Sequence, residues 1–129
     1  METELTNTAT VLGNYNSVPT EISTTALVVT MLSGLTVTKS ADKPIWSEGN
    51  LTYTIEINNA TTADYTNPVI TDILNPTLIT LVKGSIKVDS TVLEESNYTF
   101  EDSTGKLTIT LPDITTQSKK TVTFEVSKK

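Results

Sequence analysis

The chain contains no cysteine and no histidine, and aromatic residues make up only 5% of its 129 residues. Without these side chains, the sequence offers no disulfide, no thiol catalysis and none of the usual zinc ligands. A serine nucleophile activated by a histidine base is excluded as well. The sequence also lacks a glycine-rich phosphate loop and any apolar stretch long enough to cross a bilayer. We therefore expect no enzyme, no cofactor, no metal site and no membrane insertion.

Basic residues are also scarce, because nine Lys and Arg stand against 15 Asp and Glu, for a formal net charge of −6. This balance argues against nucleic acid and anionic membranes as partners. The N-terminus carries Glu2 and Glu4, where a secretory signal would carry basic residues followed by an apolar run. Either a signal has been removed, or the protein leaves its cell without one.

The residues that are abundant are threonine, valine and isoleucine, and they alternate with a period of two. Turn signals recur about every eight to twelve residues, which is typical of an antiparallel β-sandwich. A turn is expected at 13–17. The predicted strands span residues 5–12, 22–31, 35–39, 51–58, 69–74, 78–82, 85–88, 98–100, 107–111 and 121–126. We predict an all-β protein with an N-terminal hairpin or arm at 1–33 and an incomplete sandwich at 34–129.

Four ordered segments carry a family resemblance: LTVTKSADKP, EGNLTYTIEINNATT, NPVITDILNPTLITLVKGS and ITLPDITTQSKKTVTFEV. They cover nearly all of residues 35–126 and are similar to the conserved-repeat domain of bacterial surface proteins, labelled "domain of unknown function eleven". The resemblance implies a structural, immunoglobulin-like sandwich that usually occurs in tandem. LTNTATV and EISTTALVVT resemble the last two strands of such a repeat, so the chain looks cyclically permuted.

The permutation means that the N-terminal hairpin completes either its own sandwich or that of a neighbour. If the hairpin ends near Thr30, residues 31–34 join it to Leu35 and reach only ~14 Å. Crossing the sandwich takes ~30 Å. We therefore expect donor-strand exchange between subunits, which builds a head-to-tail fibre. The expected subunit interface comprises Leu5, Ala9, Val11, Ile22, Leu27 and Val29. A permuted monomer or a solvated N-terminal arm is the alternative.

Three polar residues, Asn7, Lys39 and Asp72, fall on the apolar faces of predicted strands. Burial lowers the pKa of a lysine and raises that of an aspartate, which favours a nucleophilic amine and a protonated acid. Attack of the Lys39 amine on the Asn7 amide would release ammonia and leave an isopeptide bond. This set resembles the collagen-adhesin domains of Gram-positive surface proteins. The resemblance implies Lys39 as nucleophile, Asn7 as electrophile and Asp72 as catalytic acid.

Two other interpretations of the same residues stay open at this point. Asn7, Lys39 and Asp72 can form an ordinary hydrogen-bonded trio, or a Lys39–Asp72 ion pair capped by Asn7. The function expected from the whole sequence is that of a structural, pilus-like fibre subunit that assembles with copies of itself. Its expected location is extracellular, on a cell or spore surface, for example as a spore appendage assembled in a cell that later lyses. The alternative is a monomeric adhesin-type binding or spacer domain.

Overall fold

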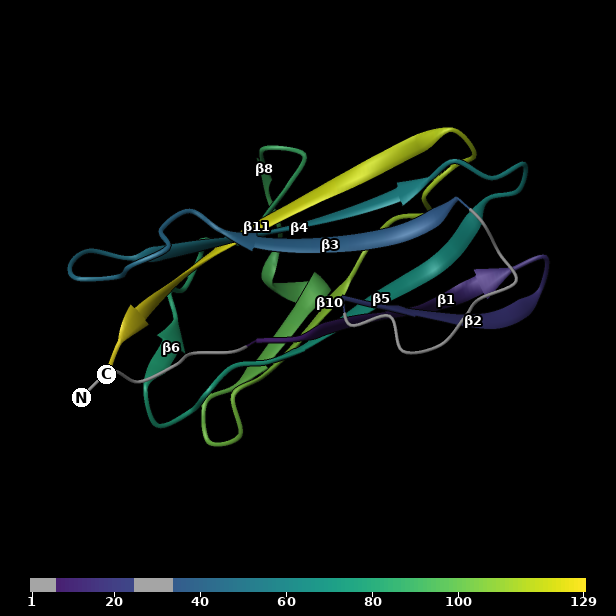
Figure 1. The fold of residues 1–129 in the computed structure, drawn as a ribbon. Helices are drawn as coiled ribbons and strands as arrows, with labels where there is room; N and C mark the ends of the chain where they lie inside the picture. Colours follow the sequence, from purple (N-terminus) through teal and green to yellow (C-terminus); the bar gives the residue numbers. More distant parts are fainter. Residues whose placement is uncertain (1–6, 25–33) are drawn as a thin grey trace.

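The computed structural model describes residues 7–24 and 34–129, which form two antiparallel β-sheets packed as a sandwich (Figure 1). The predicted all-β sandwich is confirmed. The expected interface residues Leu5, Leu27 and Val29 lie outside the described residues. The elements are β1 (Ala9–Tyr15), β2 (Val18–Ser23), β3 (Leu35–Ala41), β4 (Leu51–Asn59), β5 (Tyr65–Ile73), β6 (Ile79–Leu81), β7 (Lys87–Val88), β8 (Thr91–Val92), the 3-10 helix η1 (Glu95–Asn97), β9 (Tyr98–Glu101), β10 (Lys106–Thr110) and β11 (Ser118–Lys128).

One sheet has the strand order β2-β1-β5-β10-β9, and the other has the order β3-β4-β11-β7-β8. The short strand β6 pairs with the C-terminal part of β11. Figure 1 shows β3, β4 and β11 in one layer, with β1, β2, β5 and β10 in the other. In the part of the chain that is described, no helix is long and apolar enough to cross a membrane.

The core lies between the two sheets and follows the alternation of the sequence. In β4 every second side chain is buried, including Tyr53, Ile55 and Ile57. The neighbouring β11 places Val122 opposite Ile55 and Phe124 opposite Tyr53, whose rings are 5.5 Å apart. Each fully buried side chain of this size contributes about 1.5–3 kcal/mol of transfer free energy. The inward faces of β4 and β11 thus form a continuous apolar surface against which the opposite sheet packs.

The N-terminal hairpin has a tighter turn than the predicted one at 13–17. Strand β1 continues to Tyr15, and only Asn16 and Ser17 connect it to β2. Both residues have positive φ, 50° and 63°, as a two-residue type I′ turn requires. The register between β1 and β5 shifts between Leu12 and Asn14, which marks a β-bulge. The glycine at position 13 therefore belongs to the strand and not to the turn.

This hairpin completes the sandwich of its own chain in the structure. Strand β1 pairs with β5, with Ala9 opposite Asp72, and β2 forms the outer edge. The side chains of Ala9, Val11 and Ile22 are buried in the common core. These three predicted interface residues therefore do face the sandwich, but in the structure the sandwich belongs to the same chain.

The predicted four-residue linker, 31–34, lies almost entirely outside the described residues, and so does most of the predicted second strand at 22–31. The described strand β2 ends at Ser23 and β3 begins at Leu35, with eleven residues of sequence between them. A stretch of that length can reach about 36–40 Å, compared with ~30 Å for the sandwich. The four-residue linker therefore stays a prediction.

Candidate functional site

The structure brings Asn7, Lys39 and Asp72 together at one place between the sheets. Lys39 comes from β3 and Asp72 from β5 in the opposite sheet, and the lysine Nζ lies 2.5 Å from Asp72 Oδ2. The two side chains are only 5% and 0% exposed. Asn7 precedes β1 by two residues, so in an extended chain its side chain points to the same face as that of Ala9. Ala9 lies opposite Asp72, which places the Asn7 side chain near the Asp72 carboxyl group.

Two aromatic rings complete the surroundings of the lysine. Its Nζ lies 4.5 Å from the centroid of the Tyr53 ring and 5.8 Å from that of Phe124, within the range of cation–π contacts. The sequence analysis placed Tyr53 in the core or at its rim without linking it to Lys39. The contact could have been predicted only from the pairing of β3 with β4, in which Lys39 lies opposite Ile55, two residues from Tyr53.

The Asn7 amide is buried and lacks hydrogen-bond partners. Among the described residues, neither its Oδ1 nor its Nδ2 has a partner of acceptable geometry, and the same holds for Asp72 Oδ1. The amide does lie close enough to Asp72 to oppose the effect of burial on the pKa of that carboxyl group. A buried polar group without a partner costs about 1–3 kcal/mol, so native proteins rarely keep three of them in one place. Such a cluster requires an explanation beyond packing.

Burial shifts the pKa values of Lys39 and Asp72 toward the uncharged form of each group. Burial lowers the pKa of Lys39 below its usual 10.5, and the attraction of Asp72 opposes this shift without cancelling it. Burial likewise raises the pKa of Asp72 above 3.8, against the attraction of Lys39. Removal from water acts more strongly on each group than the partner's charge does. The site therefore favours a neutral amine beside a protonated acid more than any exposed Lys–Asp pair would.

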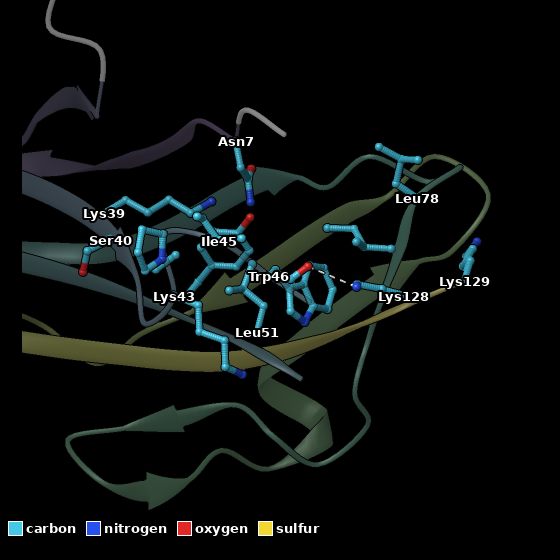
Figure 2. A pocket seen from close by; sticks show the side chains of 14 residues that line it. Asn7, Lys39, Ser40, Lys43, Ile45, Trp46, Leu51, Leu78, Lys128 and Lys129 are labelled. Atoms are coloured by element: carbon cyan, nitrogen blue, oxygen red, sulfur yellow. Dashed lines mark hydrogen bonds between the residues drawn. The ribbon is translucent and has the colours of Figure 1, made fainter. Parts of the chain in front are cut away.

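One wall of an open pocket is formed by Asn7 and Lys39. Figure 2 shows the two side chains pointing toward each other at this wall, with Trp46 and Lys128 farther along the pocket. The pocket has a volume of about 1110 Å³. Its lining is Asn7, Lys39, Ser40, Ala41, Lys43, Pro44, Ile45, Trp46, Leu51, Tyr53, Leu78, Ile79, Lys128 and Lys129. The buried Asn7 amide therefore lies beside a pocket that opens to solvent.

A second feature of the hairpin, which the sequence did not reveal, is its contact with Tyr65 on β5. The Tyr65 side chain is fully buried, and its hydroxyl donates to the carbonyl oxygens of Thr20 at 2.7 Å and Val11 at 3.1 Å. One hydroxyl thus holds both strands of the hairpin. Gly13 lies directly against the ring, where any side chain would collide. The sequence placed a polar loop just before this residue and gave Tyr65 no role.

Fold and site together define an all-β sandwich that buries a lysine, an aspartate and an asparagine where its N-terminal hairpin joins the rest. Within the described ranges, no group of three His, Cys, Asp or Glu side chains is arranged to hold a metal ion. No protein-family model, curated protein or solved structure matches this chain. The resemblances to the conserved-repeat and collagen-adhesin domains therefore stay predictions.

Proposed function

We propose that this chain is a structural subunit whose N-terminal hairpin is locked to the sandwich by an isopeptide bond between Lys39 and Asn7. The observation that carries the proposal is the buried Lys39–Asp72 contact of 2.5 Å beside an Asn7 amide without hydrogen-bond partners. A bond between Lys39 and Asn7 would remove the need to solvate either group. It would also explain why the hairpin places an amide in an apolar core.

The chemistry balances without any co-reactant. The neutral Lys39 Nζ attacks Cγ of Asn7 while protonated Asp72 polarises the amide carbonyl. The Cγ–Nδ2 bond then breaks, and Asp72 relays a proton to the departing nitrogen, which leaves as ammonia. The lysine nitrogen keeps one hydrogen in the new secondary amide, and Asp72 is regenerated. Each chain reacts once, so this is self-modification and not turnover of a substrate.

We further propose that the hairpin is exchanged between subunits to build a head-to-tail fibre of identical copies. The hairpin is a contiguous N-terminal unit that covers the edge of β5 and buries Ala9 and Val11. A neighbour's hairpin in the same place would make the same contacts, as in domain swapping. Each subunit would then insert its own hairpin into the sandwich of the next subunit. The proposed location of such a fibre is a cell or spore surface.

A second candidate is a monomeric adhesin-type binding or spacer domain with its hairpin in place. The observation that favours it is the pairing of β1 with β5 of the same chain. In that case the Lys39–Asn7 bond would form within one chain and would stabilise a single domain. The two candidates share the bond and differ only in which chain supplies Asn7.

The test is the intact mass of the full chain together with a denaturing gel. An isopeptide bond lowers the mass by one ammonia, about 17 Da per bond. A ladder that survives denaturation supports the fibre, and a monomer of reduced mass supports the second candidate. The ladder and the mass loss should disappear in Asn7→Ala, Lys39→Met and Asp72→Asn. Lys120→Met, which removes a half-buried surface lysine paired with Asp89, is the matched control.

An unchanged mass in the folded wild-type protein would refute the covalent bond. For the fibre, electron microscopy of the full chain should show filaments that are lost when residues 1–30 are deleted. A protein that stays monomeric at high concentration with its N-terminus intact would refute the exchange of hairpins, whatever its mass.

A further inference from the structure

Strand β3 is the outermost strand of its sheet and, among the described residues, pairs only with β4 (Figure 1). The phase of this ladder is fixed at both ends, where Ala60 N–H donates to the Gly34 carbonyl and Asp42 N–H donates to that of Thr52. Hydrogen-bonded and non-hydrogen-bonded pairs alternate in an antiparallel ladder. The even-numbered residues of β3 therefore bond to β4. The odd-numbered ones turn their N–H and C=O groups away from it, at Leu35, Val37, Lys39 and Ala41.

These outward backbone groups reach the solvent. The side chain of Lys39 is only 5% exposed, yet the residue as a whole is half-buried, so its backbone contributes to the open surface. Val37 is half-buried and Ala41 is exposed, although both also direct their side chains toward the interior. A row of N–H and C=O groups of this kind can pair with a further strand.

The other edges of the two sheets carry features that oppose such pairing. On β2, Pro19 lacks an N–H and Glu21 places a charge on the exposed face. In the part of the chain that is described, β6 and β8 have only three and two residues, and the four residues of β9 end in Glu101. Short strands, proline and charged side chains are the usual protections of an edge. Strand β3 has seven residues and no proline, and its one charged side chain, Lys39, points into the sandwich.

The exposed side chains of β3 suit a second copy of the same strand. They are Thr36, Thr38 and Ser40, which are all uncharged. If two antiparallel β3 strands are related by a two-fold axis at Thr38, each Thr38 lies opposite the other, and Thr36 lies opposite Ser40. Hydroxyl side chains are favourable cross-strand neighbours. No like charges meet on this face, although the whole chain has a net charge of −6.

The same register also pairs the outward backbone groups. Leu35 lies opposite Ala41 of the second copy, Val37 lies opposite Lys39, and each such pair can exchange two hydrogen bonds. The two-fold axis repeats both pairs, so the contact contains about eight backbone hydrogen bonds. Each Lys39 side chain keeps its own Asp72 as a partner, 2.5 Å away, and does not lie opposite the other lysine.

We propose that β3 is a self-association surface, which pairs antiparallel with β3 of a second copy about a two-fold axis at Thr38. The contact is isologous, because both copies use the same residues, and it joins two sandwiches through one continuous sheet. It requires neither the isopeptide bond nor the exchange of hairpins. It rests on the proposed function in one respect only: in a fibre, this edge would join two fibres side by side.

Single cysteines test the register, because the chain has no cysteine of its own. Full-length Thr38→Cys should form a disulfide-linked dimer in oxidised glutathione, since the Cβ atoms of a directly opposed pair lie only about 4.5–5.5 Å apart. Thr36→Cys and Ser40→Cys should crosslink at least about tenfold faster when mixed than when each is oxidised by itself, because they lie opposite each other and not opposite themselves. Thr99→Cys, at an exposed position of the edge strand β9, is the matched control and should not crosslink.

Sedimentation over a range of concentrations measures the pairing without a crosslink. Thr38→Lys places two positive charges opposite each other, so the dissociation constant of the pair should rise at least about tenfold above that of wild type. Thr99→Lys adds the same charge at β9 and should leave the dissociation constant unchanged. The urea midpoints of both variants should stay near the wild-type value, since both side chains are exposed, and this separates lost pairing from misfolding.

Reduction of the samples before the gel separates this proposal from the proposed function. Disulfide-linked dimers disappear on reduction, whereas an isopeptide ladder and its loss of ammonia persist. Crosslinking of Thr38→Cys without loss of ammonia would support the pairing and refute the bond. An isopeptide ladder without this crosslinking would support the bond and overturn the pairing.

Three further results would overturn the pairing of β3 strands. The first is crosslinking of Thr38→Cys that is no faster than that of Thr99→Cys. The second is Thr36→Cys that crosslinks by itself as fast as in the mixture with Ser40→Cys, because the two-fold register would then be wrong. The third is a wild-type protein that associates no more strongly than Thr38→Lys.

Discussion

Replacing Gly13 by alanine should test how tightly the hairpin is fitted to the sandwich. A Cβ at this position would lie 2.7 Å from Cε1 and Cζ of Tyr65 and 3.0 Å from the carbonyl oxygen of Thr66. Real Cβ atoms do not approach other atoms so closely, so either the ring or the strand must move. The ring cannot shift freely, because it is fully buried and its hydroxyl is bonded to the carbonyl groups of Thr20 and Val11.

The cost follows from the usual penalty for overpacking a core. An added methyl group that forces such a shift costs about 1–3 kcal/mol of unfolding free energy. For a chain of this size, each kcal/mol lowers the melting temperature by about 2–8 °C. The strain is purely steric, since Gly13 is absent from the positive-φ residues of the structure. Leu12→Ala, at a neighbouring side chain that is 51% exposed, should change stability by less than about 0.5 kcal/mol.

Urea denaturation of wild type, Gly13→Ala, Tyr65→Leu and the double variant provides the assay. Tyr65→Leu alone loses stability, because it empties part of the core and removes the hydroxyl that bonds to the carbonyl groups of Thr20 and Val11. In the double variant the smaller side chain makes room for the new methyl group, so the two losses should be less than additive by about 0.5–3 kcal/mol. A Gly13→Ala protein as stable as wild type, or losses that simply add, would refute the steric argument.

Two other predictions concern buried polar groups. In Asn7→Ala, which cannot form the isopeptide bond, the contribution of the Lys39–Asp72 pair to the unfolding free energy should pass through a minimum at intermediate pH. The raised pKa of Asp72 gives stability that is complete below 3.8 and is lost as the pH rises through the folded pKa. The lowered pKa of Lys39 gives stability that is complete above 10.5 and is lost as the pH falls through the folded pKa. The difference in urea midpoint between Asn7→Ala and Asn7→Ala/Lys39→Met/Asp72→Asn across this range checks the prediction, and a maximum of that difference at neutral pH would contradict it. Asn59→Ala removes the four hydrogen bonds of a fully buried amide and should cost about 2–4 kcal/mol in the same assay; a loss under about 0.5 kcal/mol would contradict that assignment.

Local alternation was enough to predict the sandwich and the candidate site. Asn7, Lys39 and Asp72 fall on apolar faces because side chains in a strand alternate with a period of two, and this rule needs no knowledge of distant contacts. That the three would meet at one place also depended on which strands pair. The structure shows the meeting, whereas the bond between Lys39 and Asn7 stays a prediction.

Features that depend on the pairing of distant residues could not be predicted from the alternation of side chains along each strand. Gly13 suggested a turn, since glycine usually marks one, but it serves to make room for Tyr65, which lies far along the chain. The turn itself is formed by Asn16 and Ser17, whose tolerance of positive φ is a weaker sequence signal than glycine. The predicted second strand, 22–31, extends beyond Ser23, where the described strand β2 ends, and its remainder lies mostly outside the described residues.

The contacts of the hairpin also determine how the joint would bear a mechanical load. The Lys39–Asp72 contact lies near the N-terminal end of β1, because Ala9 is opposite Asp72, and the Tyr65 hydroxyl bonds to the carbonyl of Val11, two residues farther along the strand. Two residues of a strand separate these anchors by roughly 7 Å. Tension applied along β1 would load the β1–β5 hydrogen bonds in shear, so that all of them resist together instead of opening one after another. The hairpin would therefore yield abruptly, at a force set by its whole length.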